Sequence, residues 1–338
     1  MALRMIEMVV PLDYKQNAEN LIAEQKILDV WQETVSEGRL HVQILLNTEQ
    51  TEPVLDLLEK KFSHVDGFRI ILLPVEASIP RPKQDKVTEG KEEGKEAEKR
   101  KAAKTRISRE ELYTDVEQTT RYSWVFIVLM VLSSVVASIG ILRDNVVVII
   151  GAMVIAPALG PNVALSLATT LGDIDLSRRA VKVISVAIFV ALGVSVLLGI
   201  FLKVDPGLHE LRIRTEVNLG DIALALAAGS AAVLSFTSGL LSALIGVMVA
   251  VALLPPLVTL GLLAGSGQWR MALGALLLFM ANLICVNLAG VVTFLVQGIR
   301  PLSWWEANKA KKAVRRAIFL WIVLLTALVA SILLSQKG

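Results

Sequence analysis

Cysteine, histidine and charge are all scarce in this 338-residue chain. The single cysteine, Cys285, excludes a disulfide bond within the chain and a zinc site built from cysteines. The three histidines, His41, His64 and His209, lie in different segments, so neither a histidine-based metal site nor a catalytic triad is predicted. Charged residues make up 19% of the chain, against about 25% in an ordinary soluble domain. These shortages argue against a simple soluble enzyme, and we expect no catalytic residues, no metal and no cofactor.

The charge that is present lies mainly in the first third of the chain, whereas 54% of all residues are hydrophobic. Residues 1–123 hold 19 Lys and Arg and 23 Asp and Glu, and the other 215 positions hold 15 and 8. The net charge of +3 therefore combines an acidic front part with a basic back part. Basic residues that flank apolar segments are typical of membrane proteins, so the basic pI indicates no nucleic-acid partner.

Residues 1–78 are predicted to form a small soluble α+β domain in the order strand, helix, strand, strand, helix, strand. The expected elements are Met5–Val10, Asn17–Gln25, Leu28–Thr34, Leu40–Leu46, Glu49–Phe62 and Phe68–Leu73. This order is typical of a ferredoxin-like sandwich, with two helices on one face of the sheet. The domain shows no phosphate-binding loop or carboxylate pair. Both a packing or oligomerisation role and a ligand-sensing role stay open.

The next segment, residues 79–107, is predicted to be a charged, flexible linker. It is rich in Lys, Glu and Gly and almost without apolar side chains, so folding could not offset the entropy of ordering it. Its basic residues either stay solvated or touch anionic lipid headgroups. Ser108-Arg-Glu-Glu111 matches a capping box and predicts a juxtamembrane helix within residues 108–123.

Residues 124–338 are predicted to form an α-helical multi-pass membrane domain. A helix needs about 20 apolar residues to cross the bilayer. Seven segments are candidates: Trp124–Leu142, Val146–Leu171, Val181–Leu202, Ile222–Phe236, Leu240–Ala264, Met271–Val296 and Ala317–Leu334. The basic stretch Arg300–Arg316 and the front domain are expected on the cytoplasmic side of a cell membrane.

The second and fifth of these segments align with each other. With Gly151 placed on Gly246, further identical pairs are Met153 with Met248, Val154 with Val249, Leu159 with Leu254 and Pro161 with Pro256. One apolar segment precedes and one follows each of them, so we predict two three-helix repeats. The balance of basic residues does not choose between middle segments that span the membrane and middle segments that re-enter it; their length favours spanning.

Proline in the middle of both aligned segments predicts two broken helices, because proline lacks an N–H and clashes with the preceding turn. Paired broken segments in two halves indicate a transporter-like binding site, although a packing kink is the alternative. The predicted substrate-pathway residues lie at the breaks or are neighbouring polar side chains: Pro157, Gly160, Pro161, Asn162, Pro255, Pro256, Thr259, Asn282 and Asn287. For the asparagines, the alternative that they join helices to one another is favoured. Asn282 and Asn287 need not share a helix face, since five residues correspond to roughly 140° of rotation.

Two motifs resemble a known family. They are Ile150-Gly-Ala-Met-Val-Ile-Ala-Pro-Ala-Leu-Gly-Pro161, followed by Gly172-Asp173, and Val251-Ala-Leu-Leu-Pro-Pro256. They resemble the uncharacterised hydrophobic domain family, domain of unknown function 389, over roughly Trp124–Val296. The resemblance implies a prokaryotic multi-pass membrane protein and does not identify a substrate.

The sequence is therefore consistent with two functions. The first is a transporter or channel for a small solute or ion, homo-oligomeric in the lipid bilayer and regulated by a cytoplasmic front domain. The alternative is a membrane-anchored sensor or oligomeric scaffold without transport activity. A membrane enzyme is disfavoured because no nucleophile with a partner base is visible.

Overall fold

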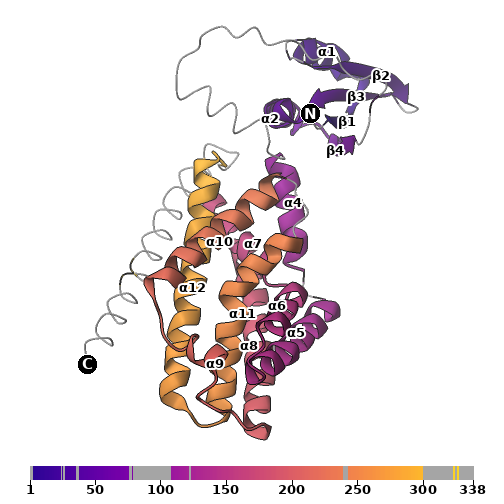
Figure 1. Cartoon of the computed structure of the whole chain (residues 1–338). Helices are drawn as coiled ribbons and strands as arrows, with labels where there is room; N and C mark the ends of the chain where they lie inside the picture. Colours follow the sequence, from indigo (N-terminus) through magenta and orange to yellow (C-terminus); the bar gives the residue numbers. More distant parts are fainter. Residues whose placement is uncertain are drawn as a thin grey trace. The chain divides into compact units, whose positions relative to one another are not determined.

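The computed structural model describes residues 3–23, 25, 27–35, 38–75, 78, 108–121, 123–238 and 243–299, together with 323 and 326. The chain divides into two compact units, Met1–Leu112 and Tyr113–Gly338, drawn in Figure 1. The whole of the predicted linker, residues 79–107, and the predicted seventh segment Ala317–Leu334 apart from two residues lie outside the described residues.

The first unit contains an antiparallel four-stranded sheet in the order β2-β3-β1-β4. Its elements are β1 (Leu3–Pro11), the short helix η1 (Leu12–Tyr14), α1 (Lys15–Ala23), β2 (Asp29–Val35), β3 (Arg39–Asn47), α2 (Thr48–Phe62) and β4 (Arg69–Val75). The order of strands and longer helices is the one expected from the hydrophobic periodicity of the sequence.

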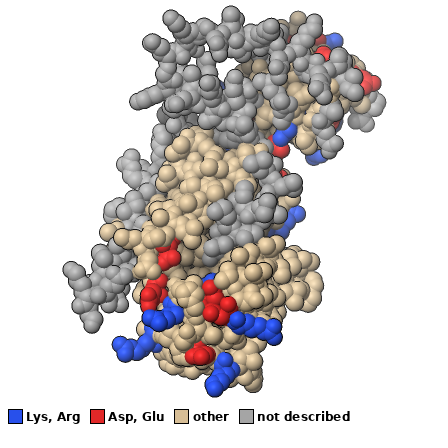
Figure 2. All heavy atoms as spheres, in the orientation of Figure 1, with Lys and Arg blue, Asp and Glu red and all other residues tan. Residues whose placement is uncertain are grey.

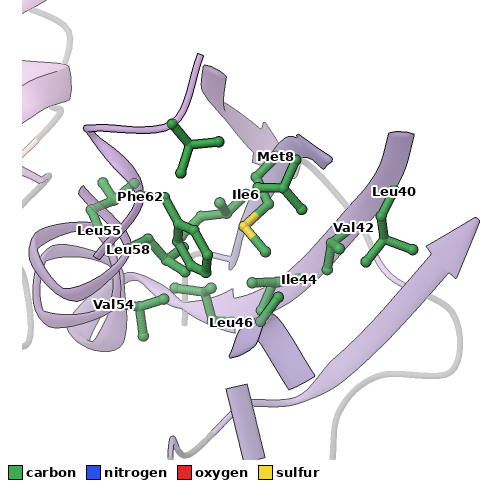
Figure 3. Packing of buried hydrophobic residues seen from close by; sticks show 13 residues of the cluster. Ile6, Met8, Leu40, Val42, Ile44, Leu46, Val54, Leu55, Leu58 and Phe62 are labelled. Atoms are coloured by element: carbon green, nitrogen blue, oxygen red, sulfur yellow. The ribbon is translucent and has the colours of Figure 1, made fainter. Parts of the chain in front are cut away.

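One face of this sheet carries the core of the first unit. Ile6 and Met8 on β1 lie opposite Ile44 and Val42 on β3, and all four side chains are fully buried. Helix α2 contributes further side chains to the same cluster, among them Phe62 (Figure 3). Alternate residues of β1 point to the other face, where burial is only partial.

The second unit is helical. It comprises most of α4 (Arg109–Thr119) and then α5 (Trp124–Leu142), α6 (Val146–Ile155), α7 (Leu159–Leu171), α8 (Ile174–Phe201), α9 (His209–Arg212), α10 (Leu219–Ser238), α11 (Ala243–Gly265) and α12 (Trp269–Val296). Helices α5, α8, α10 and α12 are each long and apolar enough to cross a membrane, and the bent pair α6–α7 would make a fifth span. Many charged side chains gather at the lower end of this unit, and most of the described surface above them consists of other residues in the same view (Figure 2). These features indicate a membrane protein.

Contacts at the two ends of the unit fix the direction of its helices. Tyr113, which precedes α5, donates a hydrogen bond from its hydroxyl to Asp173 at the start of α8, at 2.8 Å. Asp144, which follows α5, accepts one from the backbone N–H of Glu210, which follows α8, at 2.7 Å. Helices α5 and α8 therefore run in the same direction, and the α6–α7 pair between them runs back along the whole unit.

The second group of helices has the same arrangement. The Gln297 side chain, just after α12, donates to the Thr237 hydroxyl near the end of α10 at 2.8 Å. Helices α10 and α12 therefore run in the same direction, with α11 running back between them; α10, α11 and α12 pack against one another (Figure 1).

The Tyr113–Asp173 contact gives the first testable prediction. Burial and the hydrogen bond to the Asp173 carboxylate raise the pKa of Tyr113 to about 12, from an ordinary value of 10.0. The fold thus favours the neutral phenol, so the contact stabilises the protein below pH 10 and is lost as the pH rises toward 12. In a pH titration of tyrosinate absorbance, the difference between wild type and Tyr113→Phe should appear near pH 12. A difference centred near pH 10 would contradict the contact.

Candidate functional site

The site begins at the break between α6 and α7, where the chain bends by 57°. Helix α6 ends at Ile155, and Ala156 is extended with φ −66° and ψ 121°. Pro157 has no N–H, so the carbonyl of Met153 loses its usual donor four residues on. Pro161 removes the donor of the Pro157 carbonyl in the same way, and no described group donates to that oxygen. The sequence prediction of a break here is confirmed. At this break, the carbonyls of Met153 and Pro157 both lack a backbone donor four residues further along the chain.

A cavity of about 40 Å³ borders this break. Its walls come from five helices and from the break itself: Phe126, Met130, Pro157, Ala158, Pro161, Asn162, Ile184, Ala187, Ile188, Leu253, Leu254, Leu257, Phe279 and Leu283. Ile184 and Phe279 lie near the middle of the 28-residue helices α8 and α12. Among the described residues that line the cavity, only Asn162 carries an amide, hydroxyl or charged group. The cavity is therefore small, central and almost entirely apolar.

Asn162 anchors a buried polar contact between α7 and α12. Its Oδ1 accepts a hydrogen bond from Nδ2 of Asn287 at 3.2 Å, and its own Nδ2 donates to the Ala158 carbonyl at 2.7 Å. The Ser166 hydroxyl lies 3.1 Å from the Asn162 carbonyl and 3.3 Å from that of Asn287. Asn162, Asn287 and Ser166 are at most 4% exposed. Two of the predicted residues, Asn162 and Asn287, are thus brought together, and both side chains are already engaged.

This contact leads to a prediction about stability. Asn287→Leu preserves the approximate size of the side chain but removes the donor to Asn162, which leaves a buried amide oxygen unpaired. We expect the free energy of unfolding to fall by about 1–3 kcal/mol. Thermal unfolding in detergent measures the effect, with the exposed substitution Val292→Leu on the same helix as the control. Equal melting temperatures for Asn287→Leu and wild type would contradict the assignment.

The prediction of a second break, at Pro255 and Pro256, is wrong. Helix α11 continues from Ala243 to Gly265 with Pro255 and Pro256 inside it. The physical reason is that Nδ2 of Asn282 on α12 donates to the Ala252 carbonyl at 2.7 Å. That carbonyl is the one that Pro256 deprives of its backbone donor, so a side chain from the neighbouring helix replaces the missing bond.

The other predicted residues take separate places. Gly160 lies at the start of α7, and a Cβ built on it would come within 2.5 Å of the Thr119 side chain. Thr259 is fully buried, and its hydroxyl has no hydrogen-bond partner in the described part of the chain. Asn282 and Asn287 contact different helices, α11 and α7, as their spacing allows. Neither Thr259 nor the pair Pro255 and Pro256 lines the cavity.

Two close contacts between helices of the two halves are equivalent to each other under the repeat alignment. A Cβ built on Gly290 would lie 2.5 Å from Oγ of Ser166, and one built on Gly261 would lie 2.4 Å from Cβ of Ser195. The alignment of Gly151 on Gly246 places Ser166 on Gly261 and Ser195 on Gly290. Replacing each residue by its aligned partner in the other half therefore turns the Ser166–Gly290 contact into the Gly261–Ser195 contact.

A second hollow, of about 430 Å³, lies at the corner between α7 and α8. Asp173, Arg178 and Lys182 are among its lining residues. Its position at the helix ends separates it from the central cavity, which borders the middle of α8 and α12.

Most of the cavity wall was missed by reasoning from the sequence. Phe126, Met130 and Ile188 are apolar residues in apolar helices, and such residues carry no local signal of a cavity. Ala187 could have been found, because the repeat alignment places it on Asn282.

The pattern of the family described as "Domain of unknown function (DUF389)" matches residues 153–288. The chain is 32% identical over 329 residues to an uncharacterized protein of Methanocaldococcus jannaschii, and the match covers 97% of this chain and 98% of that relative. No solved structure matches the chain.

Proposed function

For this chain, which belongs to the DUF389 family, we propose that the helical unit carries a small solute across a cell membrane. One observation carries the proposal: the α6–α7 helix is broken next to a cavity that borders the middle of α8 and α12. In a bilayer, irregular backbone is tolerated only where it is buried in protein or lines a cavity. Transporter sites near the midplane are built from such discontinuous helices.

An inverted repeat supports the same function. Each half has three successive long segments, with the outer two parallel and the middle one running back. The exchanged contacts Ser166–Gly290 and Ser195–Gly261 are what a pseudo-two-fold axis between the halves would produce. Because three crossings bring the chain to the opposite face, the second half is inverted relative to the first. In this proposal the cavity lies where the two halves meet.

The front domain is proposed to be a ferredoxin-like regulatory module on the cytoplasmic side. Its order of elements and its sheet order β2-β3-β1-β4 support that fold. The complete protein would act as a homo-oligomer in the lipid bilayer.

The experiment is a flux measurement on full-length protein in liposomes, against a panel of ions and small neutral solutes. Wild type should pass at least one of them, and Ala158→Trp at the cavity should abolish that flux. Val147→Trp is the matched control, because Val147 is 77% exposed on α6 and lies outside the cavity lining. If wild-type vesicles pass no solute of the panel, the proposal is wrong.

A scaffold without transport activity is the second candidate. The open face of the sheet favours it, because Trp31, Ile71 and Leu73 are 44%, 45% and 38% exposed. Register places Trp31 beside Gln43, Gln43 beside Glu7 and Glu7 beside Ile71, so these side chains share one face. For this candidate, Trp31→Asp should reduce the oligomer size of the full chain in detergent while no flux is found for wild type.

A further inference from the structure

The two halves differ at one aligned position that borders the cavity. The alignment of Gly151 on Gly246 places Pro157 on Ala252, Pro161 on Pro256 and Ala187 on Asn282. In the second half, the Asn282 amide donates to the Ala252 carbonyl, whose backbone donor Pro256 has removed. In the second half, a side chain thus replaces the bond that Pro256 removes.

In the first half the aligned carbonyl belongs to Pro157, which lies in the break between α6 and α7, and no asparagine stands at the position aligned with Asn282. Pro161, the third residue of α7, has no N–H to donate, and no described group donates to the Pro157 carbonyl. Ala187 stands where the second half has an asparagine, and an alanine side chain has nothing to donate. Pro157, Pro161 and Ala187 all line the cavity. The cavity therefore occupies the place of the amide that fills the corresponding position in the second half.

We infer that this cavity is a binding site for a small uncharged hydrogen-bond donor, of the size of water or ammonia, that donates to the Pro157 carbonyl. This inference rests on the proposed transport function and names the class of its solute. In it, the solute makes the hydrogen bond that the amide of Asn282 makes to Ala252.

Size and charge support this class. A volume of about 40 Å³ holds one or a few molecules of water size, since one needs about 10–15 Å³ of this measure. The carbonyl is an acceptor, so its ligand must donate. The described lining residues include no acidic side chain to compensate a cation and no basic one to bind an anion, and an unpaired ion in such surroundings carries a large desolvation cost.

Two substitutions of similar size at one position test the hydrogen bond. Ala187→Asn fills the cavity and supplies the donor, whereas Ala187→Leu fills it without a donor. Ala187→Asn should melt about 2–4 °C higher than Ala187→Leu, the shift expected for one net hydrogen bond. If Ala187→Asn melts at or below the temperature of Ala187→Leu, the Pro157 carbonyl does not lack a donor and the inference is overturned.

Flux of the solute is measured in liposomes that contain the full chain. Stopped-flow light scattering follows osmotic water movement, and an enclosed pH dye follows the alkalinisation that ammonia entry produces. At least one permeability of wild type should be several times that of empty vesicles, and both Ala187 variants should return it to that level. Phe189→Leu, on the outward side of α8 and 73% exposed, should keep the wild-type rate.

A third variant supplies the donor without filling the cavity, should the bulkier ones fail to fold. Pro161→Ala supplies a backbone N–H in the first turn of α7, four residues after Pro157, and should lower the flux. A wild-type rate in folded Pro161→Ala would overturn the inference.

The failure of this inference and that of the proposed function are distinguishable. If wild type passes a larger or charged solute of the panel but neither water nor ammonia, transport stands and the solute class is wrong. If it passes nothing, the transport function itself is wrong.

Discussion

Gly199→Val is expected to destabilise the helical unit by about 3 kcal/mol, the upper range for overpacking of a packed interior. A Cβ at position 199 of α8 would lie 2.4 Å from the backbone oxygen of Leu262 on α11. Because the obstructing atom belongs to the backbone, no side-chain rotation relieves the overlap, and the two helices must separate. Small residues at such crossings are typical of helices that pack in membranes. The melting temperature in detergent and the yield of folded protein measure the effect.

Gly193→Val on the same helix is the control. No atom of the described residues lies within 4 Å of a Cβ built on Gly193, so this substitution should change stability by no more than about 0.5 kcal/mol. Equal losses for the two variants would show that valine disturbs α8 itself and that the α8–α11 contact is not close.

Asn282→Leu is expected to have the second large effect, a loss of about 1–3 kcal/mol, because it leaves the buried Ala252 carbonyl without a donor. The substitution should also bend α11 at Pro255 and Pro256, where the sequence alone predicts a break. Unfolding in detergent measures the stability.

A double-mutant cycle separates this hydrogen bond from packing. Pro256→Ala restores a backbone N–H four residues after Ala252, so Asn282→Leu should cost less in that background than in wild type. If the cost of Asn282→Leu is the same in both backgrounds, the amide does not replace the bond that Pro256 removes.

A structural feature could be predicted from the sequence when it is determined by residues that are close to one another along the chain. The order of elements in the first unit follows from periodicity within each segment, such as the alternation of Ile6, Met8 and Val10. The break at Pro157 also follows from neighbouring residues. Pro255 and Pro256 carry the same local signal, yet α11 continues. Of the two carbonyls that these prolines deprive of a backbone donor, that of Ala252 accepts a hydrogen bond from Asn282, 30 positions away. No pattern within a single helix shows such a partner.

The residues of the candidate site likewise fall into those that could be predicted from the sequence and those that could not. The sequence identifies Pro157, Pro161 and Asn162 because their chemistry is conspicuous in an apolar segment. It does not identify the walls, which are ordinary apolar residues brought together by packing. The difference between Ala187 and Asn282 becomes informative only when the repeat alignment and the cavity are considered together.

The direction in which α8 crosses the membrane tests the inverted arrangement most directly. In a Cys285→Ala background, single cysteines at Ser177 and Arg212 are labelled with a membrane-impermeant maleimide from each side, and an epitope tag at the N-terminus marks the side of the front domain. If the α6–α7 pair spans the membrane, Ser177→Cys labels from the tagged side and Arg212→Cys from the opposite side. Labelling of Ser177→Cys from the opposite side and Arg212→Cys from the tagged side would show that α6–α7 re-enters, and would contradict two inverted halves around a central cavity.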